Sequence, residues 1–345
     1  MTCSGEGRAC DLSTQFTAFI STMICRMAIS TTSLCEVNDA NGIYGLVKEF
    51  VELAAKLSLG EVLGPLRKLD LFGYGKRIQE VVAWFDQVVE GIMKEHEENF
   101  EGRTKDMMDI LLQVYRDPNA EIKLTRKNIK SFFLDFFLAG TDTSAVTLQW
   151  TMAEIINHPQ VLNKLRAEMD SVLGSTRLVN ESDVPNLPYL QAVVKEVLRL
   201  HPAIPVNVRE PAEDCIVNGY DLKAHTRVMF NFYAIMRDPE VWPNPDKFIP
   251  ERFLVNRSEI NGRDQLVMDK KGQDFTYIPF GRGRRGCPGE SLALTVIHAT
   301  VGALIQCFDW KIDGGYKVNM EEGSGFSLVL AKPLVVHPIT RFNPF

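Results

Sequence analysis

The 345-residue sequence predicts a mainly α-helical fold with small β-sheets. Apolar residues recur at helical spacing over residues 13–58 and again over Arg77–Phe100. The longest helical pattern begins at Thr125 and runs to about His158, where Pro159 stops it. Between residues 205 and 222 the pattern changes to short strand candidates, so helices dominate and the β structure is minor.

Composition and charge place the chain among ordinary globular proteins. Hydrophobic residues make up 45% of the sequence and charged residues 24%, which is ample material for a core. The net charge of -6 argues against a nucleic-acid-binding protein, because the basic excess of that class is missing. Seven scattered cysteines without a Cys-x-x-Cys pair fit a reducing compartment best and argue against a disulfide framework. Residues 1–14 are polar, so we expect no N-terminal signal or anchor in this chain.

Within the long helix, Ala139–Ser144 brings a glycine, two threonines, a serine and an acid into an apolar pattern. Glycine weakens a helix, and hydroxyl groups can bond back to carbonyls and bend it. We therefore expect a local kink whose polar groups face a pocket. The alternative is a set of satisfied hydroxyls in a helix packed among others.

The following segments supply helices and a hairpin. Pro159–Leu173 is predicted as a helix that Gly174 ends. Tyr189–Leu200 is predicted as another, and it carries Glu196 and Arg199 three residues apart, where they can pair. Strands are then expected over residues 205–209, 215–217 and 220–222, with Asn218 and Gly219 as the hairpin turn between the last two.

The loop Phe280–Gly289 contains one cysteine, Cys287, among four glycines and three arginines, before an apolar helix predicted over Leu292–Phe308. Glycines let the backbone approach a flat ligand closely, inward-pointing turn amides stabilise a thiolate, and arginine binds carboxylates. A single thiolate suits an axial ligand to haem iron, whereas zinc and iron–sulfur clusters need several ligands. The alternative is a buried cysteine beside a basic loop that binds phosphate or RNA.

This loop resembles the Phe-x-x-Gly-x-Arg-x-Cys-x-Gly signature of the cytochrome P450 superfamily, the haem-thiolate monooxygenases. The resemblance implies that Cys287 ligates the iron and that Arg285 meets a haem propionate. It also implies that Phe280 lies beside the sulfur, and that Gly283 and Gly289 let the loop and the next helix close on the porphyrin.

Three further matches follow the family's order. Ala139–Ser144 is similar to the oxygen-binding groove, which implies that Thr143 holds dioxygen and delivers protons while Asp142 feeds the relay from solvent. The haem would then lie between the helix of Thr143 and the loop of Cys287.

The other two matches, Glu196 to Arg199 and Pro250–Phe253, concern structure around the haem. Glu196 and Arg199 are expected to form one buried ionic cluster with Arg252 of Pro250–Phe253, a structural and not a catalytic group. Arg209 matches a position that often contacts a propionate, and an exposed strand arginine is the alternative.

The resemblance implies a cytochrome P450 fold lacking its N-terminal part. Residues 1–345 would form a single partial domain, with the anchor and the first helices and strands absent. The implied cofactor is haem b (iron protoporphyrin IX), and the implied reaction inserts one oxygen atom of dioxygen into a C–H bond. Electrons would come from NADPH-cytochrome P450 reductase. The full-length family is expected at the endoplasmic reticulum membrane, on its cytosolic face.

Residues 137–146, 185–192 and 341–345 resemble plant microsomal members of the flavonoid and isoflavonoid group. The implied substrate is a small apolar or phenolic plant metabolite, of flavonoid, isoflavonoid or triterpenoid type. Ala203, Ile204, Val206 and Asn207 would line its pocket, and residues 325–327 resemble a turn that often touches substrate.

Three alternatives remain open from the sequence. A haem-thiolate isomerase or dehydratase would work without a reductase, but such relatives often lose the threonine found here as Thr143. A truncated, non-catalytic fragment would bind haem poorly. A nucleic-acid-binding module would rest on Arg282, Arg284 and Arg285, and the acidic net charge disfavours it.

Overall fold

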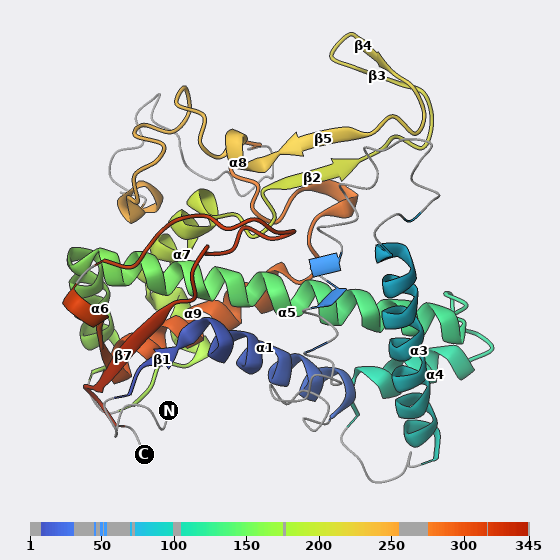
Figure 1. The fold of residues 1–345 in the computed structure, drawn as a ribbon, viewed down its shortest axis with the longest axis horizontal. Coiled ribbons are helices and arrows are strands. Elements are labelled where there is room, and N and C mark those ends of the chain that lie inside the picture. The colour runs from blue at the N-terminus through green and yellow to red at the C-terminus, as the bar shows by residue number, and fades with distance from the viewer. Residues whose placement is uncertain are drawn as a thin grey trace. The chain divides into compact units, whose positions relative to one another are not determined.

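The computed structural model describes residues 8–30, 45, 49–50, 52–53, 70, 73–98, 105–174, 177–254, 275–315 and 317–343 (Figure 1). The chain forms two compact units. Unit 1 comprises residues 1–12, 146–323 and 327–345, and unit 2 comprises residues 13–145 and 324–326. The predicted mainly α-helical class with small sheets is confirmed.

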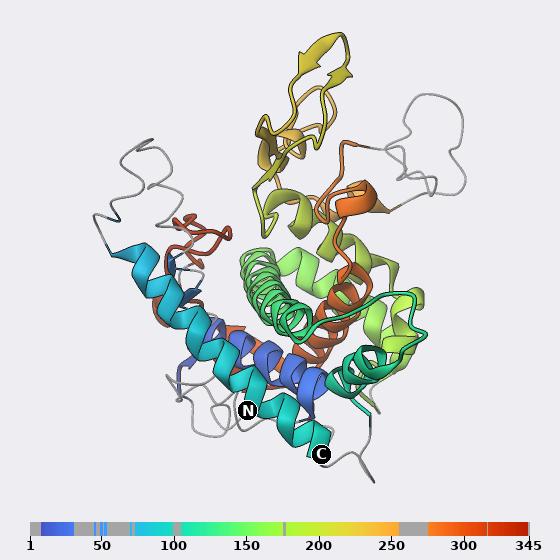
Figure 2. The same cartoon turned by 90° about the vertical axis from the view of Figure 1, so that its right-hand side faces the viewer.

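Unit 2 is helical in its described part. It contains α1 (Leu12–Ile29) from its second residue, α3 (Tyr74–Glu98), α4 (Met107–Arg116) and the first part of α5 (Arg126–Asn157) (Figure 2). The apolar stripes of these helices form the core, where the rings of Phe85 and Phe137 meet edge to face at 6.3 Å. A Cβ atom at Gly140 would lie 3.1 Å from the side chain of Ile24, so a small residue lets α5 approach α1 closely.

A buried polar contact joins α3 to the start of α4. His96 places Nδ1 2.8 Å from the carbonyl oxygen of Ile92 and Nε2 3.0 Å from Oδ2 of Asp106. Asp106 also caps α4 by a reciprocal capping box with Asp109. His96, Asp106 and Asp109 have the residue types of a metal site. Because their atoms serve the helix cap, we regard the group as structural.

Unit 1 contains the remaining helices and the strands. Its helices are the second part of α5, α6 (Pro159–Leu173), α7 (Pro188–Leu200), α8 (Phe232–Ile235) and α9 (Glu290–Cys307), with short 3-10 helices η4 (Glu181–Asn186), η5 (Pro250–Phe253), η6 (Gly283–Arg285) and η7 (Asp313–Gly315). By length and composition α9 could cross a membrane, but its second half packs against α6, α7 and η4 as a core helix does. At Gly302 a Cβ atom would lie 2.8 Å from Val179, which shows how closely α9 is packed.

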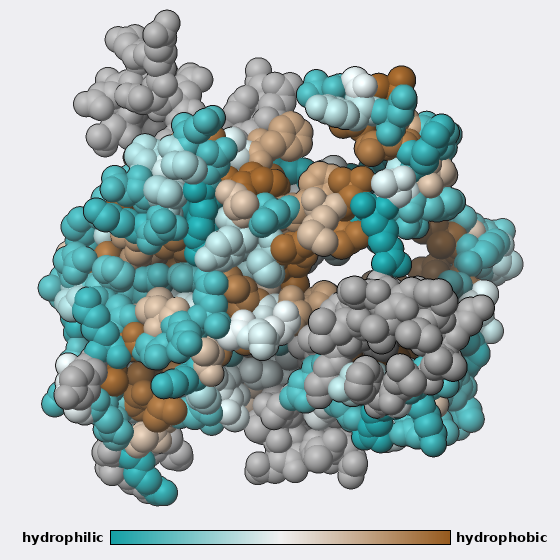
Figure 3. All heavy atoms as spheres, turned by 45° about the horizontal axis from the view of Figure 1, so that its top comes forward, coloured by the Kyte–Doolittle hydropathy of each residue, from teal (hydrophilic) through white to brown (hydrophobic). Residues whose placement is uncertain are grey.

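Three small antiparallel sheets lie in the described part of unit 1. Their strands are β1 (Cys10–Asp11), β2 (Val206–Arg209), β3 (Cys215–Val217), β4 (Tyr220–Leu222), β5 (Val228–Asn231), β6 (Phe308–Lys311) and β7 (Val335–Thr340). The sheets are ordered β1-β7-β6, β2-β5 and β3-β4. Apolar side chains remain exposed on β2, β5 and the β3-β4 hairpin, including Ile216, Tyr220 and Met229 (Figure 3).

Most predicted elements lie within a few residues of the observed ones. The bounds of α6 are as predicted, and the hairpin turns at Asn218 and Gly219. The expected kink is not seen as a break, because α5 is helical through residues 139–144. The sequence did not predict α4, β1 or β5. The stretches 31–44, 54–69 and 255–274, which include parts of the predicted helices and loops, lie outside the described residues.

The state of the cysteines agrees only in part with the expected absence of a disulfide framework. Cys10, Cys215, Cys287 and Cys307 are free. Cys25, buried on α1, is disulfide-bonded, which differs at this one position from the expectation of a reducing compartment.

Candidate functional site

The loop of Cys287 in unit 1 is folded on itself by backbone hydrogen bonds. The N–H of Cys287 donates to the carbonyl of Phe280 at 2.9 Å, and the N–H of Gly286 donates to the carbonyl of Gly283 at 3.0 Å. Gly281 and Gly283 have φ values of 68° and 70°, in the left-handed region that favours glycine. The predicted sharp turns are therefore present.

The thiol of Cys287 is free and exposed at the start of α9. Gly289 is the N-cap residue of this helix, two residues after the cysteine. A Cβ atom at Gly289 would lie 3.8 Å from the sulfur of Cys287, which is ordinary contact distance. Phe280 is half-buried at the other end of the loop.

Several arginines lie on the loop of Cys287 and on β2. Arg284 and Arg285 are exposed, and within the described residues no carboxylate or other acceptor pairs with either guanidinium. Arg209, at the end of β2, donates to the carbonyls of Arg285 at 3.2 Å and of Val208 at 3.0 Å, and to the side chain of Asn207. Arg209 therefore contacts the cysteine loop. An arginine exposed on a strand, the alternative interpretation, would not make this contact.

These residues fit a haem group. The loop presents one sulfur ligand, which suits haem iron and excludes a structural zinc site built from this loop alone. The unpaired guanidinium of Arg285 suits a propionate. Next to the loop, the apolar residues Leu292, Ala293, Leu294 and Val296 of α9 are half-buried, as an apolar macrocycle requires of its neighbours.

The hydroxyl-bearing segment of α5 lies in unit 2. Thr143 donates from Oγ1 to the carbonyl oxygen of Ala139 at 2.7 Å, which confirms the predicted bond from a hydroxyl back to a carbonyl. Asp142 and Thr143 are half-buried, whereas Thr141 is fully buried and its Oγ1 has no partner among the described residues. A hydroxyl and a carboxyl group are therefore adjacent at this part of the helix.

The predicted ionic cluster is confirmed in unit 1. Arg199 donates from Nε and Nη2 to the two oxygens of Glu196 at 2.8 and 3.0 Å, and Arg252 donates from Nε to Oε1 of Glu196 at 2.9 Å. Glu196 and Arg199 have no exposed surface. Arg199 also donates to the carbonyl of Met236, and the backbone N–H of Ile249 donates to Glu196. One carboxylate therefore holds α7, η5 and the segment between them together.

Tyr277 connects the cysteine loop to the same helix. Its hydroxyl donates to the carbonyl of Lys195 on α7 at 3.2 Å. Burial raises the pKa of Tyr277 well above its ordinary value, so the hydroxyl keeps its proton. Arg282, at the start of the loop, reaches the carbonyl of Tyr277 at 3.5 Å.

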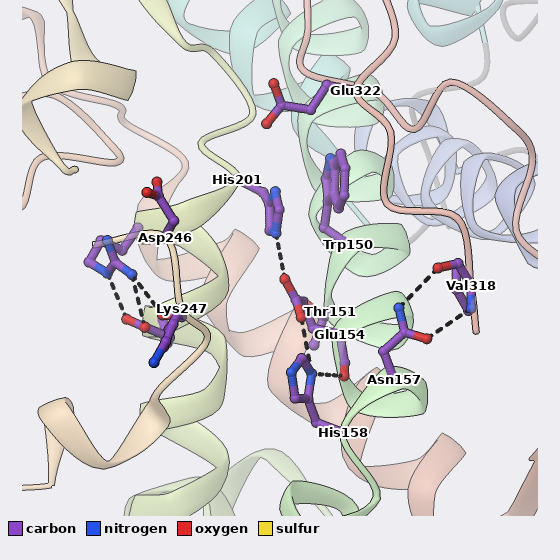
Figure 4. Close-up of polar contacts among 12 residues, drawn as sticks. Trp150, Thr151, Glu154, Asn157, His158, His201, Asp246, Lys247, Val318 and Glu322 are labelled. Carbon is purple, nitrogen blue, oxygen red and sulfur yellow. Dashed lines mark hydrogen bonds and ion pairs between the residues drawn. The ribbon is translucent and has the colours of Figure 1, made fainter. Parts of the chain in front are cut away.

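Besides the ionic cluster, unit 1 contains a second set of interacting polar side chains around Glu154, which was not predicted from the sequence (Figure 4). Glu154 on α5 lies between His201, at the end of α7, and His158, with Nε2 of His201 2.7 Å and Nδ1 of His158 3.2 Å from its oxygens. The ring of His201 stacks on Trp150 with centroids 3.9 Å apart. From the sequence, His201 is expected to make a structural hydrogen bond, which the contact with Glu154 confirms. Its partners were not predicted, and the local signal for the other pair is the spacing of Glu154 and His158 four residues apart.

Comparison with known proteins supplies the wider context. A family model described as Cytochrome P450 matches residues 2–338. Cytochrome P450 93A3 of Glycine max is 46% identical over 99% of this chain and 67% of its own length. The 3,9-dihydroxypterocarpan 6A-monooxygenase of the same plant is 46% identical over 98% and 67%, and its beta-amyrin 24-hydroxylase is 43% identical over 94% and 64%. The chain thus spans about two thirds of the length of these relatives.

A solved structure agrees with these relatives. A zebra fish cytochrome P450 determined with progesterone superposes with a TM-score of 0.79 at 27% identity, covering 99% of this chain and 73% of its own.

Proposed function

The chain belongs to the cytochrome P450 family and is a cytochrome P450 monooxygenase, and from this premise we propose that it oxidises a C–H bond of a small apolar or phenolic plant metabolite. The flavonoid, isoflavonoid and triterpenoid classes are the candidates. Two relatives support this choice, because one is named for a pterocarpan and the other for beta-amyrin. We also propose that residues 1–345 form one cytochrome P450 domain, because the family match runs across both compact units.

Haem iron is the cofactor of this family, and we propose haem b, held by the thiolate of Cys287. The observation that carries the proposal is the free, exposed thiol on a loop closed by the hydrogen bond from Cys287 to Phe280. When bound, haem with a thiolate ligand supplies the activation of dioxygen, because thiolate donation favours O–O cleavage.

The other loop residues would bind and orient the group. Arg285 would pair with a propionate, for which its guanidinium is free among the described residues. Arg209 would act beside it, since it already bonds to the carbonyl of Arg285. Phe280 would cover the sulfur, and Gly283 and Gly289 would let the backbone come close.

Thr143 and Asp142 would deliver protons to the reaction. The oxygenase reaction consumes protons, and positioned donors are needed to deliver them. In the structure the Thr143 hydroxyl donates a hydrogen bond to the carbonyl oxygen of Ala139. Asp142, half-buried beside it, would pass protons from solvent. Electrons would come from NADPH-cytochrome P450 reductase, with the enzyme at the cytosolic face of the endoplasmic reticulum membrane.

The test is the reduced carbon-monoxide difference spectrum of the purified chain. We expect a strongly red-shifted Soret band that disappears in Cys287→Ser. Cys215→Ser is the matched control, because Cys215 is also a free thiol but lies on the β3-β4 hairpin. A red-shifted band that persists in Cys287→Ser would contradict the assignment of the ligand, and a chain that takes up no haem would contradict the proposed function.

A further inference from the structure

His201 lies at the centre of a buried arrangement that the proposed chemistry does not use (Figure 4). One edge of its ring contacts Glu154 through Nε2, at 2.7 Å. One face lies flat on the indole of Trp150, with an angle of 2° between the planes. The remaining nitrogen, Nδ1, is buried and has no partner among the described residues.

These contacts favour one of the two ring nitrogens as the hydrogen-bond donor. Burying an N–H group without an acceptor costs free energy, and burying a ring nitrogen that carries no hydrogen costs less. The tautomer with its proton on Nε2 donates to Glu154 and leaves Nδ1 as the bare nitrogen. On the other side of the carboxylate, hydrogen bonding to Glu154 raises the pKa of His158. Lys317, the other charged group near His158, opposes this rise.

The stacked pair is connected to the chain segments on either side. Trp150 donates from Nε1 to the carbonyl oxygen of Leu328 at 2.6 Å. Leu328 in turn donates its backbone N–H to the carbonyl of Ala203 at 3.0 Å. Ala203 follows His201 by two residues, so Trp150, Leu328, Ala203 and His201 close a ring of contacts.

We propose that His201 is a positioning residue for the substrate pocket. Held by Glu154 and stacked on Trp150, it fixes the place of Ala203 and of the chain that continues into β2, and with them Leu328. It touches no substrate itself. The inference rests on the proposed function in one respect, because residues 203–207 are expected to line the pocket.

The position of His201 explains why both contacts are needed. The stacking fixes the plane of the ring but permits rotation within that plane, whereas the hydrogen bond to Glu154 fixes the rotation. Glu154 and Trp150 are four residues apart on α5, so one rigid helix holds both partners. The segment after α7 therefore takes its position from α5.

Hydrogen–deuterium exchange tests the positioning without any haem. In His201→Phe the ring is kept and the donor is lost. We expect exchange in peptides containing Leu328 and residues 203–209 to accelerate by about tenfold or more, as loss of a hydrogen bond to a charged group predicts. His201→Gln restores a side-chain donor that can reach Glu154. We expect its exchange rate to lie between those of His201→Phe and the wild type. If His201→Phe fails to fold, the comparison of His201→Gln with wild type still tests the inference.

His158→Gln is the matched control, because it removes the other imidazole from Glu154 and leaves the Trp150 stack intact. It is expected to leave exchange at Leu328 unchanged. Wild-type exchange at Leu328 in both His201 variants would overturn the proposal, and so would an equal acceleration in His158→Gln.

The consequence for the reaction is tested separately, by the products formed from 3,9-dihydroxypterocarpan with NADPH and reductase. Positioning predicts a changed ratio of products, or a changed KM at similar kcat, in His201→Phe with the carbon-monoxide band retained. An unchanged ratio and KM would overturn the role in the pocket. A wild-type chain without the carbon-monoxide band would instead refute the proposed function, and the exchange result would still decide the positioning.

Discussion

Replacing Glu196 with alanine is expected to destabilise the folded chain by about 3–5 kcal/mol. The Glu196 carboxylate is fully buried and accepts hydrogen bonds of 2.8–3.0 Å from Arg199, Arg252 and the backbone N–H of Ile249. Alanine would leave the guanidinium of Arg199, which has no exposed surface, without a carboxylate. Removing one member of a buried pair is strongly destabilising because the other charge stays buried. Proteins are stable by only about 5–15 kcal/mol, so the loss is large.

The assay is urea unfolding followed by circular dichroism. Glu240→Ala is the matched control, because Glu240 is exposed and its replacement should change the free energy of unfolding by less than about 0.5 kcal/mol. Glu196→Gln should fall between the two, since glutamine keeps one acceptor oxygen but not the charge. A loss below about 1 kcal/mol in Glu196→Ala, with an unchanged denaturant slope, would refute the reasoning.

Two further predictions concern α5. Thr143→Ala is expected to lower product formation by about 100-fold or more with the carbon-monoxide band retained. The control is Thr151→Ala, which removes an equivalent hydroxyl bonded to the carbonyl of Thr147 at 2.7 Å. Equal turnover of the two variants would contradict the role of Thr143 in proton delivery. The second is a pH dependence. Burial raises the pKa of Glu154, but hydrogen bonds from His158 and His201 bring it below its ordinary 4.5, so its contribution to stability is present above 4.5 and is lost as the pH falls through the lowered pKa. The pKa of His158 is raised above 6.5, so its contribution is present below 6.5 and is lost as the pH rises through the raised pKa. The difference in unfolding free energy between wild type and His158→Gln should therefore be largest between 4.5 and 6.5, and a pH-independent difference would be inconsistent with the pairing.

Features determined by nearby residues were predictable from the sequence. The long helix begins as expected, because Thr125 and Asn128 cap each other, and Pro159 stands at the first position of α6. The bond from Thr143 to Ala139 spans four residues. The ionic cluster was found through a resemblance, because its carboxylate and second arginine lie 56 residues apart.

Other features were not predicted, either because they depend on distant partners or because apolar spacing does not show them. The strand β5 has four residues, and it is a strand because it pairs with β2. The short helix α4 is specified by a capping box at Asp106, which apolar spacing does not reveal. His201 and Glu154 are 47 residues apart, and no local pattern connects them. Hydroxyls in the middle of α5 suggested a kink, but backbone hydrogen bonding continues because a bond from a threonine to a carbonyl one turn earlier is compatible with a helix.

The attachment of the cysteine loop to α7 has a consequence for ligand binding. The loop is preceded by Tyr277, whose hydroxyl bonds to Lys195, and α7 is in turn fixed to Arg252 through Glu196. The backbone bond from Cys287 to Phe280 closes the loop within itself. The conformational entropy of the loop is therefore lost when the chain folds. A group that binds at Cys287 does not have to order the loop again, so more of its interaction energy remains as affinity.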